Sequence, residues 1–285
     1  MRSFRPAGPL VLTMGATTHD VTNRALVMGI LNRTPDSFYE PAATYDLDEL
    51  FARAELLVGE GADILDVGGV RAGPGAPVSE ADELDRVIPV IEELHRRFDV
   101  PLSVDTWRAG VAAAGFEAGA VVGNDISGFA DPEYLKVAAA AGATVVATHI
   151  RLAPRVADPH PHYDDVTATV RDVLTELRRR AYDAGLAPGQ VILDAGLDLG
   201  KSPAQSLQLL RDSTDLAELG SVLLLSASNK TFLGAMFDLP VLERAEASLA
   251  ATALGIAGGC RVVRAHDVGA TVRVRDALGA VMEAR

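Results

Sequence analysis

The chain has 285 residues, of which 48% are hydrophobic and 23% charged, a composition that excludes a disordered chain and allows a large buried core. Its 26 Lys and Arg against 39 Asp and Glu give a formal net charge of −13, which argues against a general binder of nucleic acid or of anionic membranes. A single cysteine, Cys260, excludes an intramolecular disulfide framework, and no apolar run approaches the roughly 20 residues of a membrane span, so the expected location is cytoplasmic.

Eight short runs rich in Val, Ile and Leu have the composition of buried strands. In chain order they are residues 25–32, 62–69, 101–105, 120–127, 143–150, 190–196, 221–228 and 260–266. Between them lie apolar residues at helical spacing, best seen in 163–186 and in 79–98, where Ser79 is the predicted N-cap. Such strands alternating with amphipathic helices predict a parallel sheet covered by helices.

The count of strand–helix units decides between two α/β architectures. Eight units favour a single (β/α)8 TIM barrel over a doubly wound sheet. No composition shift or long low-complexity stretch divides the chain, so one barrel domain is predicted over residues 25–285. Residues 1–24 are predicted to form a short N-terminal cap or hairpin at the bottom of the barrel.

Polar or ionisable side chains stand at the C-terminal end of each predicted strand. They are Asn32, Asp66, Asp105, Asn124, Asp125, His149, Asp194, Ser228, Asn229, Lys230, Arg264 and His266. In α/β barrels the chemistry is carried at this end of the strands, whereas the opposite face is structural. Convergence of several charges into one apolar cup therefore predicts a binding or catalytic site.

The chemistry of this group suggests a ligand. Lys230, Arg264 and His266 follow the last two strands, where barrels commonly bind phosphate, and they supply the local cations that an acidic chain needs for an anion. A second set, on the third, fourth and sixth strands, offers carboxylates and one amide to a planar heterocycle with several N–H donors; it comprises Asp105, Asn124 and Asp194. The cup thus predicts a heterocycle that carries an anionic tail.

Several residues near the site also have a structural interpretation. Asp66 precedes two glycines and could do no more than accept hydrogen bonds from backbone N–H groups. Asp125 alternates away from the face of its neighbour Asn124, so a structural role is expected for it. His149 is either a hydrogen-bonded core histidine or a ligand-binding residue, and Lys201 either anchors an anion or begins the next helix.

Two further patterns are weak. The stretch DVGGVRAGPGA at 66–76 follows a strand and is rich in glycine, but it lacks G-x-G-x-x-G spacing, and Pro74 removes a backbone N–H that a phosphate cradle would use. His160 and His162, in the Pro-bounded loop DPHPHYDD, could chelate a metal, although two residues are little evidence for a site.

Seven segments together carry a resemblance to a known family. They are MGILNRTPDSF (28–38), GADILDVGG (61–69), PLSVDTWRA (101–109), NDISG (124–128), VILDAGLDLGKSP (191–203), LSASNKTFLGA (225–235) and VVRAHDV (262–268). In this order and spacing they resemble the dihydropteroate synthase family over about residues 25–280. The resemblance implies a (β/α)8 barrel, usually a homodimer, that condenses 6-hydroxymethyl-7,8-dihydropterin diphosphate with para-aminobenzoate and releases diphosphate, with Mg²⁺ as cofactor.

The resemblance also implies roles for individual residues. The pterin pocket would consist of Asp105, Asn124, Asp194 and Lys230. The diphosphate and its Mg²⁺ would be met by Asn32 as metal ligand, Arg264 and His266. The implied catalytic residues are Lys230, Arg264 and His266. Ala72 stands at a position where the family binds substrate.

Differences from the family pattern are concentrated in two loops. Where the family has a Ser-Asp-Gly-Gly-like segment this chain has Tyr39, Glu40, Pro41 and Ala42, and the Glu-Ser-Thr-Arg segment is replaced by Val70, Arg71, Ala72 and Gly73. On the pterin side, Asn229 replaces an Arg, Thr148 a Met and Leu199 a Phe. These differences lead to an alternative function, a divergent homologue that binds pterin-like ligands weakly and lacks synthase activity. Methyl transfer from a methylated pterin, with a corrinoid partner, is a third.

Overall fold

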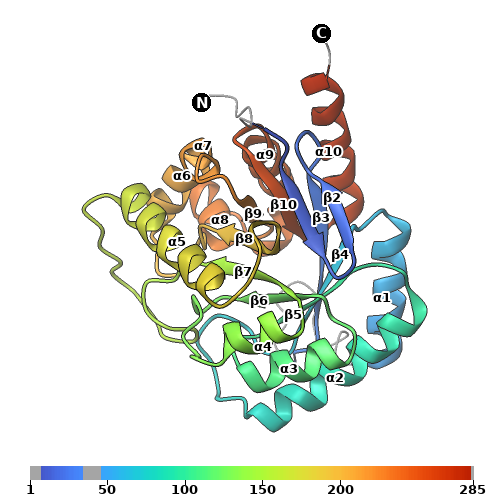
Figure 1. The fold of residues 1–285 in the computed structure, drawn as a ribbon. Coiled ribbons are helices and arrows are strands. Elements are labelled where there is room, and N and C mark those ends of the chain that lie inside the picture. Colours follow the sequence, from blue (N-terminus) through green and yellow to red (C-terminus); the bar gives the residue numbers. More distant parts are fainter. Residues whose placement is uncertain (1–7, 35–45, 284–285) are drawn as a thin grey trace.

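The computed structural model describes residues 8–34 and 46–283, and it is a closed barrel of parallel strands surrounded by helices (Figure 1). The barrel strands are β3 (Leu26–Asn32), β4 (Ile64–Gly68), β5 (Leu102–Asp105), β6 (Val122–Asp125), β7 (Thr144–Thr148), β8 (Val191–Asp194), β9 (Val222–Ser226) and β10 (Cys260–Ala265). They pair in chain order, and β10 closes the ring against β3. All eight lie within the predicted runs, so the predicted (β/α)8 fold is confirmed.

Helices connect consecutive strands and form the outer layer in Figure 1. They are α1 (Leu47–Gly59), α2 (Glu80–Arg97), α3 (Ala109–Glu117), α4 (Tyr134–Ala140), α5 (Val166–Asp183), η2 (Pro188–Gln190), α6 (Pro203–Arg211), α7 (Ser213–Ala217), α8 (Thr231–Phe237), η3 (Val241–Glu243), α9 (Ala245–Ala257) and α10 (Val268–Glu283). Ser79 caps α2, as predicted, and it forms a capping box with Asp82.

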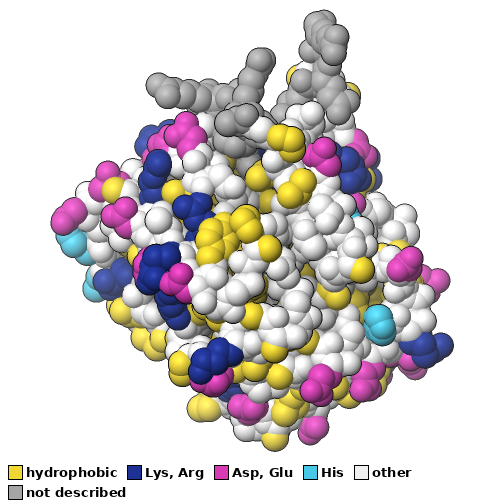
Figure 2. Space-filling model, viewed as in Figure 1, with side chains coloured by type: hydrophobic (Ala, Val, Ile, Leu, Met, Phe, Trp, Pro, Cys, Tyr) yellow, Lys and Arg dark blue, Asp and Glu magenta, His cyan; other side chains and the backbone are white. Residues whose placement is uncertain are grey.

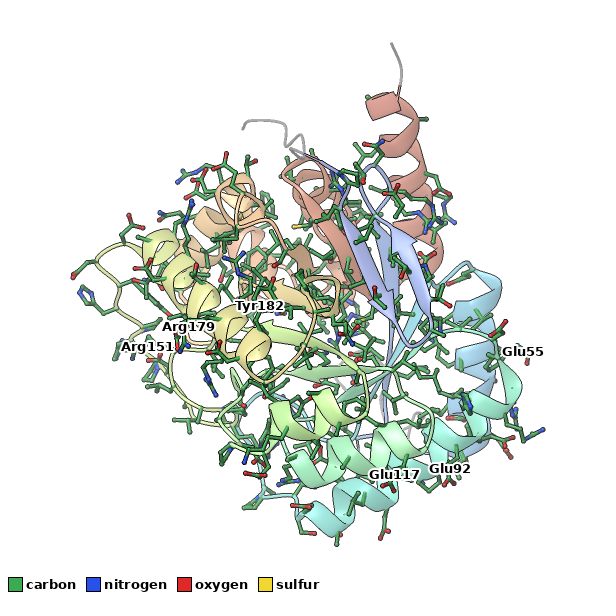
Figure 3. All side chains as sticks on the ribbon, viewed as in Figure 1. Glu55, Glu92, Glu117, Arg151, Arg179 and Tyr182 are labelled. Atoms are coloured by element: carbon green, nitrogen blue, oxygen red, sulfur yellow. The ribbon has the colours of Figure 1, made fainter. Side chains whose placement is uncertain are left out.

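Many charged side chains lie on the outer surface of the helical layer. Glu55 of α1, Glu92 of α2 and Glu117 of α3 point outward in Figure 3, as does Arg179 of α5. On the face shown in Figure 2, acidic and basic side chains are interspersed around the periphery, and no broad basic surface is present there. Among the described helices, none has the length and apolarity required to cross a bilayer.

A β-hairpin covers the N-terminal end of the barrel. It consists of β1 (Val11–Met14) and β2 (Thr17–Asp20), which pair antiparallel. Leu12 and Met14 are buried and belong to the same apolar cluster as inward-facing strand residues such as Ile64 and Val262. The hairpin therefore keeps water out of the structural end of the barrel and leaves the carboxyl end as the place for a site.

The role of the hairpin can be tested with two neighbouring substitutions. Leu12→Ala should lower the free energy of unfolding by about 2–5 kcal/mol, because a fully buried side chain is removed from a packed cluster. Val11→Ala is the matched control, since Val11 is 42% exposed on the other face of the strand and should cost under about 1 kcal/mol. Urea unfolding measures both changes, and equal midpoints for the two variants would contradict this assignment.

Candidate active site

The carboxyl ends of the barrel strands enclose a cavity of about 300 Å³. Its lining includes every residue to which the family resemblance gives a substrate, metal or catalytic role, namely Asn32, Ala72, Asp105, Asn124, Asp194, Lys230, Arg264 and His266. It also includes Val70, Arg71 and Gly73 from the loop after β4, together with Leu199 and Asn229. The structure thus brings the predicted residues together in one place. Tyr39, Glu40, Pro41 and Ala42 lie outside the described residues.

An arginine joins three strands at the base of this cavity. Arg264 of β10 donates from Nε to Asp66 Oδ2 of β4 at 2.6 Å and from Nη2 to Asp105 Oδ2 of β5 at 2.9 Å. Asn124 of β6 donates from Nδ2 to the same Asp66 oxygen at 3.1 Å. Since charge-assisted hydrogen bonds of this length are strong and directional, the four side chains form one fixed polar network.

Asp66 contacts side chains of the site, whereas the sequence interpretation gave it only hydrogen bonds to backbone N–H groups. It accepts from two side chains of the site, Arg264 and Asn124, and its side chain is completely buried. A signal for this was present in the sequence, because alternation along ILDVG places Ile64 and Asp66 on the same face of β4. Ile64 packs in the barrel interior and Leu65 packs under the helices, so Asp66 had to point inward.

Two carboxyl groups of the site have raised pKa values. Burial and the charge of Asp66 raise the pKa of Asp105 to about 7, and Arg264 opposes the shift only in part. Burial likewise raises the pKa of Asp194, while Lys230 and a hydrogen bond from Gly196 N at 2.8 Å act in the other direction. A carboxyl group that titrates near neutral pH, as Asp105 does, suits a ligand with ring N–H groups and ring nitrogens.

Lys230 is held over the cavity by the loop between β9 and α8. Its Nζ donates to Leu197 O at 2.7 Å, and burial lowers its pKa. Asn229, the preceding residue, has a left-handed backbone with φ 58° and accepts from Arg244 Nη1 through its carbonyl oxygen at 3.0 Å. Arg244 was not singled out from the sequence, because it lies in a different segment and contacts only the backbone of this loop. Ordering of the loop thus fixes the position of the ammonium group.

His266 follows β10 at the rim of the cavity. Its Nδ1 lies 3.0 Å from Ser228 Oγ, and its carbonyl oxygen accepts from Arg53 Nη2 at 2.6 Å. Burial, with the charges of Arg264 and Arg53, lowers the pKa of His266 to about 3. The imidazole is therefore neutral at pH 7, so it serves as a hydrogen-bonding group and adds no positive charge for an anion.

His149 and Lys201 form a buried pair next to the cavity. Lys201 Nζ lies 2.8 Å from His149 Nδ1 and also donates to Gly196 O at 2.8 Å and Leu199 O at 3.1 Å. Burial is the main reason that the pKa of His149 falls to about 3 and that of Lys201 to about 7. The structural interpretation of His149 agrees with these contacts, and Lys201 fastens the loop after β8.

Asp125 and the two loop histidines have no part in the cavity. Asp125 accepts from Ser127 N at 2.5 Å and Phe129 N at 3.0 Å, so its role is structural, as expected from alternation. His162 lies 3.4 Å from Asp164 in an exposed pair. No cluster of three or more His, Cys, Asp or Glu suited to a metal ion occurs within residues 8–34 and 46–283, which gives the histidine metal-site hypothesis no support.

The fold and the cavity define a class, an α/β barrel whose carboxyl end binds a polar heterocycle beside a cationic group. Comparison with known proteins is specific. The sequence model of the family described as "Pterin binding enzyme" matches residues 28–266. An inactive dihydropteroate synthase 2 of Mycobacterium leprae is 42% identical over 269 residues, which cover 92% of each chain. A dihydropteroate synthase of Synechocystis is 40% identical over 269 residues, and the match covers 93% of each chain.

Solved structures agree with the sequence comparison. The crystal structure of Yersinia pestis dihydropteroate synthase with a sulfonamide drug complex superimposes with a TM-score of 0.92 at 36% identity, covering 96% of this chain and all of that one. The Xanthomonas albilineans dihydropteroate synthase with 4-aminobenzoic acid superimposes with a TM-score of 0.88 at 35% identity, covering 98% of this chain and all of that one. The chain therefore belongs to the dihydropteroate synthase family of pterin-binding enzymes.

The network around Arg264 predicts a measurable change in protonation. Asp66→Asn should lower the pKa of Asp105 from about 7 by roughly one unit or more, because a neighbouring negative charge disappears and Arg264 is left with Asp105 as its one charged partner in the network. Carbon-13 NMR titration of aspartate side chains measures the shift. A pKa of Asp105 that stays the same or rises in this variant would contradict the assigned couplings.

Proposed function

We propose that this protein condenses 6-hydroxymethyl-7,8-dihydropterin diphosphate with para-aminobenzoate. The amine nitrogen forms a C–N bond to the pterin methylene as the C–O bond to diphosphate breaks, the diphosphate leaves with the electron pair, and the amine loses a proton. The observation that carries the proposal is the convergence of carboxylates, an amide and two cations on one cavity, in a chain about 40% identical to dihydropteroate synthases.

The assigned roles follow from charge and geometry. Asp194 and Asn124 hold the pterin through its N–H groups and ring nitrogens, and Asp105 contributes a carboxyl group that titrates near neutral pH. Lys230 completes the pterin pocket. Arg264 and His266 meet the leaving diphosphate, where the guanidinium stabilises the negative charge that develops on it. Positive charge develops at the same time on the pterin methylene, so a site closed to water protects this carbon from hydrolysis.

Mg²⁺ is the cofactor that belongs to this proposal. The ion usually keeps several waters and binds through few protein groups together with substrate phosphates, so it needs no cage of carboxylates. Asn32 lines the cavity, and its Oδ1 lies against Gly68 of the neighbouring strand, where an added Cβ would come within 3.2 Å of this oxygen. Mg²⁺ would supply charge for the leaving diphosphate, and Asn32 would hold it.

An inactive pterin-binding protein is the second candidate. The loop after β4 places Val70, Ala72 and Gly73 on the cavity, and the last two have no polar side chain with which to reach a diphosphate or an amine. The M. leprae relative, described as inactive, is as similar to this chain as the Synechocystis enzyme. These observations favour retention of the pterin pocket with loss of the condensation.

Association into a homodimer and a cytoplasmic location are part of the proposal. Large apolar side chains are exposed in one segment that spans α8 and η3, namely Met236, Phe237 and Leu242. Such a group is more typical of an interface than of a free surface. The location rests on the single cysteine, whose burial is consistent with a structural thiol in a reducing compartment.

Calorimetric titration with the pterin diphosphate and Mg²⁺, followed by an assay for dihydropteroate after para-aminobenzoate is added, tests the function. We expect binding and turnover, and Asp194→Asn should weaken pterin binding roughly 10- to 100-fold because a charge-assisted contact is lost. Asp183→Asn on the exposed end of α5 is the matched control and should change neither. Binding without product would favour the inactive homologue, and no binding would exclude both candidates.

The loop after β4 can be altered toward the family pattern. Ala72→Thr combined with Gly73→Arg should raise kcat/KM by about two orders of magnitude if these positions limit the reaction, since a charge-assisted contact contributes roughly 1.5–3 kcal/mol. Gly73 accepts a side chain without backbone strain, because the nearest atom to its added Cβ is 3.8 Å away. Steady-state kinetics at saturating pterin diphosphate measure the change, and an unaltered kcat/KM would show that this loop does not limit catalysis.

A further inference from the structure

A second cavity, of about 310 Å³, adjoins the candidate active site. Three residues line both cavities: Ala72 and Gly73 from the loop after β4, and Leu199 from the loop after β8. All three have small or aliphatic side chains, so no charged group separates the two spaces at these positions. The two cavities meet at these three residues, which we call the aliphatic saddle. A ligand in the first cavity could reach the second at this point.

The wall of the second cavity is largely apolar. It is formed by the loop between β7 and α5, with Ile150, Leu152, Ala153, Val156 and Ala157. Within this loop Leu152 is 45% exposed and Val156 is 54% exposed. Arg151, labelled in Figure 3, lies in the same loop at the periphery of the molecule. Apolar side chains gathered beside a polar site are a common feature of ligand pockets.

Lys201 lines the second cavity, but its ammonium group is not available to a ligand. Its Nζ lies 2.8 Å from His149 Nδ1 and donates to Gly196 O at 2.8 Å and to Leu199 O at 3.1 Å. His149 O, at 3.3 Å, is a fourth partner, so the nitrogen has more protein partners than the three N–H groups of an ammonium group, and its pKa of about 7 leaves it only partly charged at neutral pH. The cavity thus provides no unpaired cation from Lys201 to attract a carboxylate or phosphate.

The two acidic residues in the lining are also engaged within the protein. Asp198 Oδ2 accepts from Thr231 N at 2.6 Å and from Phe232 N at 3.3 Å at the start of α8. Asp158 accepts from Arg151 with both oxygens, at 2.5 and 2.8 Å. Asp158 is thus ion-paired and Asp198 is held by backbone N–H groups, so the surface that remains for a ligand is mainly the apolar loop between β7 and α5.

The rim shared by the two cavities is held in place by an arginine. Arg155 donates from Nη1 to Arg71 O at 3.0 Å, from Nη2 to Ala76 O at 2.5 Å and from its backbone N to Ala72 O at 2.9 Å. Its own backbone is left-handed, with φ 67°, and a Cβ on Gly75 would lie 2.8 Å from its Nη2. The close approach of the Arg155 guanidinium to residue 75 is thus made at a glycine. The hydrogen bonds of Arg155 join the loop after β4 to the loop after β7. The second cavity is consequently preformed.

We propose that the second cavity binds an uncharged, apolar substituent on the amine co-substrate. This inference rests on the proposed function, because the amine is taken to lie at the shared residues Ala72 and Leu199. The co-substrate class is then an aryl amine with an apolar extension on the side of the ring opposite its amino group. The amine nitrogen still forms the C–N bond, and the extension takes no part in bond making or breaking.

Two amides that differ only in an apolar group test this. 4-Aminobenzamide and N-benzyl-4-aminobenzamide are titrated calorimetrically into the full-length protein, with and without the pterin diphosphate and Mg²⁺. We expect the benzyl compound to bind about 10- to 100-fold more tightly, because its ring is transferred from water to an apolar wall. Equal affinities for the two amides would overturn the proposal.

Variants locate the effect in the second cavity. Leu152→Ser shortens the apolar wall and should remove most of the preference for the benzyl compound while leaving 4-aminobenzamide binding unchanged, since Leu152 lines only the second cavity. Leu56→Ser is the matched control, because Leu56 is 49% exposed on α1, and it should preserve the preference. Gly73→Leu should block the saddle and remove the preference as well. A preference that survives both Leu152→Ser and Gly73→Leu would place the benzyl group elsewhere and overturn the proposal.

The outcome is distinguishable from failure of the proposed function. If the pterin diphosphate does not bind but the benzyl amide binds tightly and loses affinity in Leu152→Ser, the cavity assignment holds and the synthase proposal fails. If dihydropteroate forms from para-aminobenzoate and the two amides bind equally, the synthase proposal holds and the cavity assignment fails.

Discussion

The buried contact of Arg264 with two carboxylates is the interaction on which the site depends. A guanidinium cannot lose its proton in a protein, so its place inside the barrel requires negative partners, and Asp66 and Asp105 provide them from adjacent strands. Two carboxylates for one cation leave an excess of negative charge, which contributes to the raised pKa of Asp105. The same network holds Asn124, so charge balance and ligand-binding geometry are set together.

This polar layer rests on an apolar one. Every second residue of a strand faces the barrel interior. Ile64 therefore lies one layer below Asp66 on β4, and Val262 lies one layer below Arg264 on β10. The N-terminal hairpin adds Leu12 to the apolar layer and covers it. Without that cover, water would reach the underside of the buried ion pairs and weaken them, because their strength depends on a low local dielectric. A short segment far from the chemistry thus supports the electrostatics of the site.

The fold and the membership of the cavity were predictable because both follow from local pattern. Asp105, Asn124, Asp194 and Arg264 stand near the carboxyl ends of parallel strands and face inward by the alternation of side chains. Closure of the barrel then brings them together. Contacts between distant segments were not predictable in this way. The pairing of Asp66 with Arg264 joins residues 198 positions apart, and nothing near Asp66 in the sequence indicates its partner. The left-handed backbone of Arg155 and its contacts across two loops likewise follow from tertiary packing, which local propensity does not determine.

Three residues that differ from the family pattern, Ala72, Gly73 and Leu199, affect both the active-site cavity and its connection to the second cavity. Ala72, Gly73 and Leu199 reduce the polar and aromatic contacts available to a diphosphate or a benzoate ring, which taken alone indicates loss of the synthase reaction. The same three residues form the passage to the second cavity, and the arginine clamp keeps that passage ordered. A site that had merely lost its function would have no need of an ordered, largely apolar extension. A changed amine preference accounts for both the lost contacts and the retained order, whereas loss of activity accounts only for the first.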